Sequence, residues 1–195
     1  MNILKDKVVL ITGAGRGNGR KLAEELARRG AIVVLNDISP INVEEVKAGI
    51  RAEGGQAKSF IEDVAKKVGA QMLVKEVEDA FGKIDILINH AAVEPHTPLL
   101  DMDEWDWHRT LDVNLTGTFL MTQSVGRVMR AKGSGVIVCL GAGTSEKAKE
   151  AGAYLTSKAA VSEFAHQADR ELSRHGVRVH AVDSFAEALH VLEDA

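Results

Sequence analysis

The chain has 195 residues, of which 45% are hydrophobic and 27% charged, the balance of a soluble globular protein with a full core. A formal net charge of −4 gives no basic surface for nucleic acid, and no apolar run approaches the roughly 18 residues of a membrane span. One cysteine, Cys139, excludes an internal disulfide and is typical of a reducing compartment. We therefore expect a cytoplasmic protein that binds neither nucleic acid nor membrane, with no signal peptide at its start.

The first predicted element is a buried strand at residues 7–12, which ends in a glycine-rich turn. A helix is predicted over 17–29, directly after this turn, because its apolar residues form one stripe. A glycine turn between a strand and a helix N-terminus is typical of a phosphate site, since the backbone comes close to the ligand and free N–H groups face it. The candidate binding residues in this turn are Gly13, Arg16, Gly17, Asn18 and Gly19.

The remaining elements alternate between strands and amphipathic helices. Further strands are predicted over 31–35, 56–61, 84–88, 136–140 and 177–182, and further helices over 39–53, 64–81, 102–131, 151–174 and 184–194. Connections of this length give parallel pairing, right-handed crossovers and helices on both faces of the sheet. We predict one domain over residues 1–195 with an α/β fold, a doubly wound (Rossmann) parallel sheet of strand order 3-2-1-4-5-6.

In such a sheet, ligands bind at the carboxyl ends of the strands, so residues just beyond each strand are candidate site residues. Asp37 follows the second strand, where a carboxylate can accept hydrogen bonds from the hydroxyls of an adenosine ribose. The same charge repels a 2′-phosphate, which favours NAD over NADP as the cofactor. Arg16 in the glycine turn is a counter-signal, since it could meet that phosphate.

Two further strands end in candidate site residues. Asp63 and Val64 follow the third strand, where they can bound an adenine ring, and Asp63 can also cap the next helix. Small residues follow the fourth strand and let the chain pass close to a ligand, in the run Asn89-His90-Ala91-Ala92. His90 has no evident catalytic partner, and the scattered histidines lack ligand spacing, so we expect no metal.

Five motifs in one order make the chain resemble the short-chain dehydrogenase/reductase family from about residue 5 to 182. They are the glycine turn, Asp63-Val64, Asn89-x-Ala91, Asn114 with its neighbours, and Tyr154-x-x-x-Lys158. The resemblance implies that Tyr154 is a general acid/base, that Lys158 lowers its pKa and binds the nicotinamide ribose, and that Asn114 holds a water in a proton relay. The spacing agrees, because residues four apart share a helix face and an ammonium favours a phenolate.

The sequence departs from the family pattern in its last third. The family has a catalytic serine on the loop after the fifth strand, where this chain has Gly141 or Ala142, with Thr144 or Ser145 as later hydroxyls. A lost carbonyl-polarising donor typically costs roughly 10²–10³ in rate. The family also continues past the sixth strand with a substrate-covering segment and a seventh strand. Here the seventh strand is missing, and we expect the helix at 184–194 or a partner subunit to cover the sixth strand's edge.

Two interpretations follow. The first is an NAD-dependent oxidoreductase, impaired by the missing serine, that interconverts a secondary alcohol and a ketone through Tyr154, Lys158 and Asn114. The alternative is a related dinucleotide-binding protein with little or no turnover, which the missing serine, the missing lid and Ala92 motivate. The helices at 102–131 and 151–174 resemble the pair through which family members dimerise, so a homodimer is expected, with a tetramer as the less secure option. The sequence does not identify the substrate.

Overall fold

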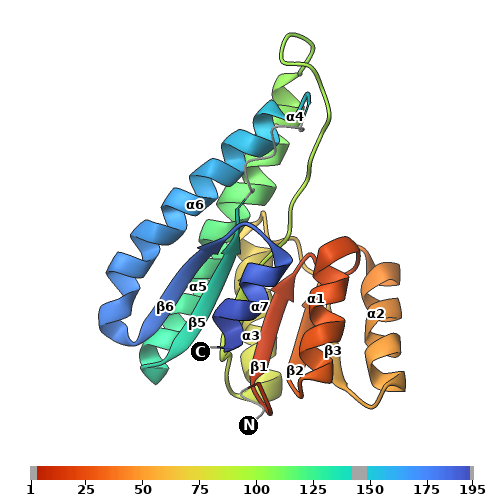
Figure 1. Ribbon diagram of the computed structural model, residues 1–195, viewed down its shortest axis with the longest axis vertical. Helices are drawn as coiled ribbons and strands as arrows, with labels where there is room; N and C mark the ends of the chain where they lie inside the picture. Colours follow the sequence, from red (N-terminus) through yellow and green to blue (C-terminus); the bar gives the residue numbers. More distant parts are fainter. Residues whose placement is uncertain (1–3, 142–148, 194–195) are drawn as a thin grey trace.

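The computed structural model describes residues 4–141 and 149–193, and its sheet has the predicted strand order. Six parallel strands are hydrogen-bonded in the order β3-β2-β1-β4-β5-β6 (Figure 1). The strands are β1 Val8–Thr12, β2 Ile32–Asn36, β3 Gln56–Phe60, β4 Ile86–Asn89, β5 Gly135–Leu140 and β6 Val177–Val182. Because β1 and β4 are neighbours, the strand order reverses between them, and a ligand crevice is expected beyond their carboxyl ends.

Helices cover both faces of the sheet (Figure 1). One face carries α1 Gly17–Arg28, α2 Pro40–Ala52 and α7 Phe185–Glu193, and the other carries α3 Lys67–Phe81, α5 Gly117–Lys132 and α6 Gly152–Leu172. The continuous apolar run of β1 is explained by this layering, since Val9 and Ile11 pack on the first face while Val8 and Leu10 pack on the second. None of the described helices is long and apolar enough to cross a membrane.

The single helix predicted over 102–131 is three elements. Helix α4 spans Glu104–Leu111, a π-helical turn spans Asp112–Thr116, and α5 follows from Gly117. A wider turn of this kind often marks a functional site, and here it holds Asn114. Helix α4 lies beyond the strands' carboxyl ends, at one end of the molecule (Figure 1).

Helix α3 begins three residues later than the 64–81 prediction. The Oδ1 of Asp63 accepts a hydrogen bond from the backbone N–H of Ala65 at 3.0 Å, and the residue before the helix is Lys66. Asp63 therefore stabilises the turn that leads into α3 instead of capping the helix itself. This arrangement leaves Val64 outside the helix, next to the end of β3.

The helix predicted at 184–194 is α7, and it does not cover the edge of β6 as expected. It turns back onto the face of the sheet beside α1, where Ala188 and Leu192 are buried in the same apolar cluster as Leu22 and Leu26 of α1. The apolar stripe of α7 is buried more completely on a sheet face than along a strand edge, which offers only backbone groups. Within the described residues, β6 is the last strand of the sheet.

Helices α5 and α6, which belong to the pair that the family resemblance implies for a dimer interface, lie side by side with a groove between them. Phe119 of α5 is 40% exposed. Its ring meets that of Phe164 edge-on, with centroids 6.2 Å apart. Both rings line a groove between the two helices together with Gly126 and Leu172. The homodimer stays a prediction.

A buried carboxylate fastens the end of the sheet opposite the strands' carboxyl ends. Asp85 is 7% exposed, accepts a hydrogen bond from the N–H of Val8 at 2.8 Å, and pairs with Lys83 at 2.8 Å and with Lys132. Burial by itself raises the pKa of the Asp85 carboxyl, but the hydrogen bonds from Lys132, Lys83 and Val8 outweigh it and lower the pKa to about 2. Asp85 thus links β1, the start of β4 and the end of α5.

Replacing Asp85 with Asn is expected to lower the free energy of unfolding at pH 7 by about 2 kcal/mol, because one pKa unit corresponds to about 1.4 kcal/mol. The folded-state pKa is depressed, so the wild-type contribution is present above the unfolded pKa of about 4 and is lost as the pH falls toward 2. Urea unfolding of both proteins between pH 7 and pH 3 measures this.

The matched control is Asp79→Asn, which removes an exposed ion pair of 2.7 Å with Lys75 on α3. Exposed pairs of this kind contribute about 0.5 kcal/mol or less. Equal losses in the two variants, or an acid dependence that Asp85→Asn leaves unchanged, would show that Asp85 is no more important than a surface carboxylate.

Candidate active site

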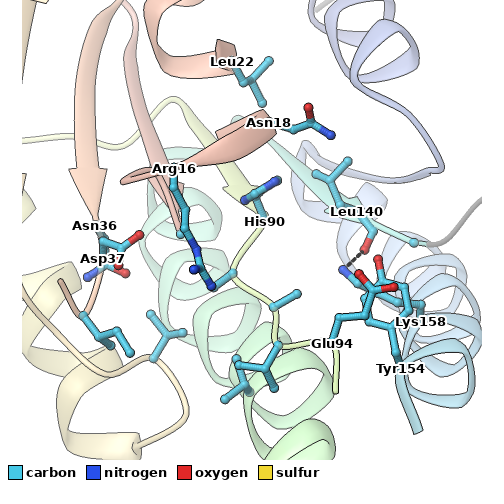
Figure 2. A pocket seen from close by; sticks show the side chains of 18 of the residues that line it. Arg16, Asn18, Leu22, Asn36, Asp37, His90, Glu94, Leu140, Tyr154 and Lys158 are labelled. Carbon is cyan, nitrogen blue, oxygen red and sulfur yellow. Dashed lines mark hydrogen bonds between the residues drawn. The ribbon is translucent and has the colours of Figure 1, made fainter. Parts of the chain in front are cut away.

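A cleft of ≈ 470 Å³ opens at the carboxyl ends of the strands (Figure 2). Its walls come from the glycine turn, the ends of β2 and β3, the loop after β4, the end of β5, helix α6 and the start of α7. The predicted site residues that line it are Gly13, Arg16, Asn18, Asp37, Asp63, Val64, Ala91, Tyr154 and Lys158. The fold therefore gathers one side of the predicted cofactor site and the Tyr154–Lys158 pair into the same cavity.

The glycine turn is held in place by close backbone contacts. Gly13 has φ of +67°, and a Cβ there would lie 2.7 Å from the Cα of Ala91. A Cβ on Gly19 would collide with the carbonyl of Gly13 and lie 2.7 Å from the Nδ1 of His90. The turn thus packs directly on the loop after β4, and Gly17 opens α1 behind it. Arg16 and Asn18 are exposed and project from this turn at the cleft (Figure 2).

Asp37 lies in the cleft wall beside the turn. Its Oδ2 accepts a hydrogen bond from the N–H of Gly15 at 2.9 Å, and its Oδ1 accepts one from the N–H of Ser39 at 3.0 Å. The carboxylate is therefore fixed in position before any ligand binds. It also stabilises the glycine turn, a role that the sequence analysis did not anticipate.

Asn89 does not line the cleft, although the sequence analysis placed it among the cofactor-binding residues. Its side chain is buried, and Nδ2 donates hydrogen bonds to Oγ1 of Thr122 at 3.1 Å and to Sγ of Cys139 at 3.5 Å. It ties the end of β4 to β5 and α5. The residues after it are held by Thr12, whose Oγ1 accepts hydrogen bonds from the N–H groups of His90 and Ala91, each at 3.1 Å.

His90 leaves a buried polar atom unsatisfied in the cleft wall. Its Nδ1 is buried and has no hydrogen-bond partner among the described residues. Burial lowers the pKa of the His90 imidazole, and the charge of Lys158 lowers it further. The His90 ring therefore packs against the glycine turn, where the Nδ1 lies close to Gly19. Figure 2 shows His90 between that turn and the Tyr154–Lys158 side of the cleft.

Tyr154 and Lys158 lie one turn apart on α6, as the spacing predicts, and both face the cleft. Lys158 is only 4% exposed, and its Nζ donates a hydrogen bond of 2.6 Å to the carbonyl of Leu140 at the end of β5. Burial lowers the pKa of the Lys158 ammonium to about 8. The Nζ lies 5.9 Å from the centroid of the Tyr154 ring.

Asn114 is fully buried and supports Tyr154 from behind the cleft. Its Oδ1 accepts a hydrogen bond from the N–H of Val93 at 2.8 Å, and its Nδ2 donates to the carbonyl of Val93 at 3.0 Å and to Oγ of Ser157 at 2.9 Å. Ser157 in turn donates to the carbonyl of Tyr154 at 2.7 Å. The side-chain amide is therefore engaged within the protein. The expected hold of Asn114 on a relay water stays a prediction.

A family model described as short chain dehydrogenase matches residues 7–185 of this chain. The chain belongs to this family. Among curated relatives, the sorbitol dehydrogenase of Cereibacter sphaeroides is 36% identical over 181 residues, which cover 92% of this chain and 70% of that protein. The parallel sheet and its helices also match the Rossmann fold of solved members of the family.

Two solved structures are close to this short chain dehydrogenase in fold. An NAD⁺-bound xylitol dehydrogenase has 32% sequence identity and a TM-score of 0.87, with 92% of this chain and 70% of that chain covered. A metagenomic short-chain oxidoreductase in complex with NADP has 28% identity and a TM-score of 0.91, with 99% and 93% covered. Solved relatives thus carry NAD or NADP, which supports a nicotinamide dinucleotide as the cofactor of this chain.

In this short chain dehydrogenase, the pKa of Tyr154 is shifted in the direction opposite to the sequence expectation. Burial raises the pKa of the Tyr154 hydroxyl, and the negative charge of Glu94 raises it further. The lowering by Lys158 that the sequence predicts is therefore not seen in the direction of this shift.

The position of the family's serine is only partly described. Gly141 lines the cleft, and a Cβ there would lie 2.5 Å from Oγ of Ser162 and 2.6 Å from Oδ1 of Asp183. A side chain at this position would therefore require the side chains of Ser162 and Asp183 to move. Ala142, Thr144 and Ser145 lie outside the described residues.

Sequence reasoning missed three parts of the cleft wall. Glu94 contributes from the loop after β4, Arg109 from α4, and the segment 183–185 from the junction of β6 and α7. Glu94 lies five residues beyond the end of β4, so the strand-end rule reaches it only when the whole loop is included. Arg109 has no signal in the sequence.

Proposed function

We propose that this short chain dehydrogenase is an NAD-linked oxidoreductase that interconverts a secondary alcohol and a ketone. The observation that carries this proposal is the presence of Tyr154 and Lys158 in the wall of the same cleft as the glycine turn and Asp37. The relative named sorbitol dehydrogenase and the solved structure named xylitol dehydrogenase support a substrate of this class.

The cleft has the donor and acceptor groups that a nicotinamide dinucleotide requires. The N–H groups of the glycine turn would hold its phosphates, and Asp37 its adenosine ribose, with Val64 and Ala91 bounding the rings at either end. Lys158 would hold the nicotinamide ribose. When bound, this cofactor supplies or accepts the hydride of the reaction.

Tyr154 moves the proton in this proposal. Its hydroxyl donates a proton to the ketone oxygen during reduction, and its phenolate accepts that proton from the alcohol during oxidation. The ammonium of Lys158 stabilises the phenolate while it carries its charge, that is, below its pKa of about 8. Asn114 and Ser157 hold the backbone of Tyr154 against the loop after β4, so they act as positioning residues.

Turnover separates this proposal from a dinucleotide-binding protein without activity. The relatives that carry activity names are dehydrogenases and reductases, which favours the enzyme. The test is calorimetric titration with NADH and NADPH, followed by oxidation of NADH with a panel of ketones. Binding of neither cofactor would remove both functions, and binding without turnover on any ketone would leave the binding protein.

Replacing Asp37 with Asn is expected to shift cofactor preference from NAD toward NADP by roughly 10- to 100-fold, because like charges held close together cost several kcal/mol. An asparagine oxygen can still accept the hydrogen bond from Gly15, so the contact with the glycine turn is retained, whereas the amide NH2 group cannot accept the second bond, from Ser39. The measurement is the ratio of dissociation constants for NADH and NADPH in the wild type and the variant.

Arg16→Ala is the paired variant, because Arg16 is the cation that could meet a 2′-phosphate. We expect it to weaken NADPH binding more than NADH binding in the Asp37→Asn background. A preference that neither change moves would refute the role of Asp37 and leave cofactor choice to other residues of the cleft.

A further inference from the structure

Glu94 places an acidic group at the reacting end of the cleft. It lies on the loop after β4, five residues beyond Asn89, and lines the cavity with Tyr154 and Lys158. Figure 2 shows its carboxylate pointing toward these two side chains. Its negative charge acts on both of them, since it raises the pKa of Tyr154 after burial and opposes the lowered pKa of Lys158. The carboxylate therefore lies near the place where a substrate would meet Tyr154.

The oxygens of Glu94 are accessible to a ligand. The side chain is 43% exposed, and its ion-pair contact among the described residues is a long one, 3.8 Å to Nε2 of the exposed His96. Among the described residues no ion pair joins Glu94 to Lys158, whose Nζ donates to the carbonyl of Leu140. A carboxylate in this state accepts hydrogen bonds and donates none.

Such a group discriminates between substrates by their chemistry next to the reacting carbon. A neighbouring hydroxyl can donate to the carboxylate, and a hydrogen bond to a charged group changes affinity by roughly 10- to 100-fold. A methylene at that place offers no donor. A carboxylate at that place is repelled, since it would lie beside a like charge.

We propose that Glu94 makes this cleft selective for uncharged α-hydroxy ketones and the vicinal diols that correspond to them. The hydroxyl beside the reacting carbon donates a hydrogen bond to the carboxylate of Glu94, while the reacting oxygen faces Tyr154. This inference rests on the proposed oxidoreductase function and specifies its substrate class. Glu94 is a specificity residue in this scheme and takes no part in the proton transfer.

The test compares three four-carbon ketones that differ in the groups attached to the carbonyl carbon. They are 3-hydroxybutan-2-one, which carries the hydroxyl, butan-2-one, which lacks it, and 2-oxobutanoate, which carries a carboxylate. Their kcat/KM values with NADH are measured for the wild type, Glu94→Ala and Glu94→Gln. The matched control is Asp101→Asn, which removes an exposed negative charge from the same connection between β4 and α4, outside the cleft wall.

The wild type is expected to prefer the hydroxyketone over butan-2-one by roughly 10- to 100-fold. Glu94→Ala abolishes this preference, whereas Glu94→Gln keeps part of it, because an amide oxygen still accepts a hydrogen bond. Both variants improve turnover of 2-oxobutanoate, since both remove the repelling charge. Asp101→Asn leaves all three ratios as in the wild type.

A second readout does not depend on turnover. Tyr154 is the only tyrosine of the chain, so the phenolate absorbance in a pH titration reports its pKa alone. Glu94→Gln is expected to move the midpoint to lower pH, and Asp101→Asn to leave it in place. An unchanged midpoint would show that the Glu94 carboxylate does not face Tyr154 and would overturn the inference.

The outcomes distinguish this inference from the proposed function. No turnover of any ketone by the wild type refutes the proposed function. Turnover with equal kcat/KM for the hydroxyketone and butan-2-one, or with a preference that Glu94→Ala leaves intact, overturns the inference and leaves the proposed function standing.

Discussion

Replacing Tyr154 with Phe is expected to lower kcat/KM by roughly 10²–10⁴ without weakening NADH binding, because the change removes one hydroxyl and the proton it transfers. The half-buried ring keeps its packing on α6, and Lys158 keeps its hydrogen bond to Leu140. The measurement is steady-state oxidation of NADH with the best ketone of the panel, alongside calorimetric titration with NADH.

The control for this prediction is Thr156→Ala, which alters an exposed residue on the same helix turn outside the cleft. It should behave as the wild type in both assays. The phenolate absorbance must also vanish in Tyr154→Phe, since the chain has no other tyrosine. Activity that is indifferent to the change would exclude Tyr154 from the reaction and favour a binding protein or another proton donor.

Replacing Lys158 with Met is expected to abolish most of the activity while making the folded protein more stable at pH 7. The gain is about 2 kcal/mol, since a pKa of about 8 against the usual 10.5 corresponds to about 3 kcal/mol and the lost hydrogen bond to Leu140 subtracts about 1. The activity falls because the phenolate of Tyr154 loses the cation that stabilises it.

The pH dependence of this stability gain follows from the direction of the shift. The folded-state pKa of Lys158 is lowered, so burial of the charged ammonium costs stability at and below neutral pH. That cost disappears as the pH rises through about 8 toward the unfolded value of 10.5, and the gap between variant and wild type closes with it. Urea unfolding at pH 7 and pH 10 measures the gap.

Lys21→Met provides the control, because Lys21 is an exposed lysine on α1. A surface substitution of this kind changes stability by about 0.5 kcal/mol or less. A Lys158→Met protein that is less stable than the wild type at pH 7 would mean that the ammonium is well solvated or paired in the folded state, and that its pKa is not lowered by burial.

The lowered pKa of Lys158 and the raised pKa of Tyr154 share one physical cause, which is burial. Both groups lie in a wall where burial penalises the charged form, so the protonated phenol and the neutral amine are favoured. The site is thus not tuned by the tyrosine–lysine pair alone. Glu94 shifts both groups toward their protonated forms, which gives this loop residue influence over the pH range in which the cleft can work.

The sequence by itself determined the order of the elements, the sheet topology and the family. Uninterrupted apolar runs such as Val8-Val9-Leu10-Ile11 identify strands covered on both faces, and one apolar stripe per helix identifies what covers them. The pairing of Tyr154 with Lys158 on one face was also predictable, because the helical repeat fixes it. These features depend on residues close together in the chain.

The tertiary structure decided which predicted residues face the cleft. Asn89 and Asn114 belong to family motifs, but their side chains do not line the cavity. Asn89 donates to Thr122, and Asn114 is bonded to Val93 and Ser157, all of which are distant in sequence. Helix α7 packs on a sheet face and not along β6, since its apolar stripe is better buried there. The pKa of Tyr154 and the position of Glu94 beside it also depend on the tertiary structure. Burial and charge act through space, and neither is set by spacing along the chain.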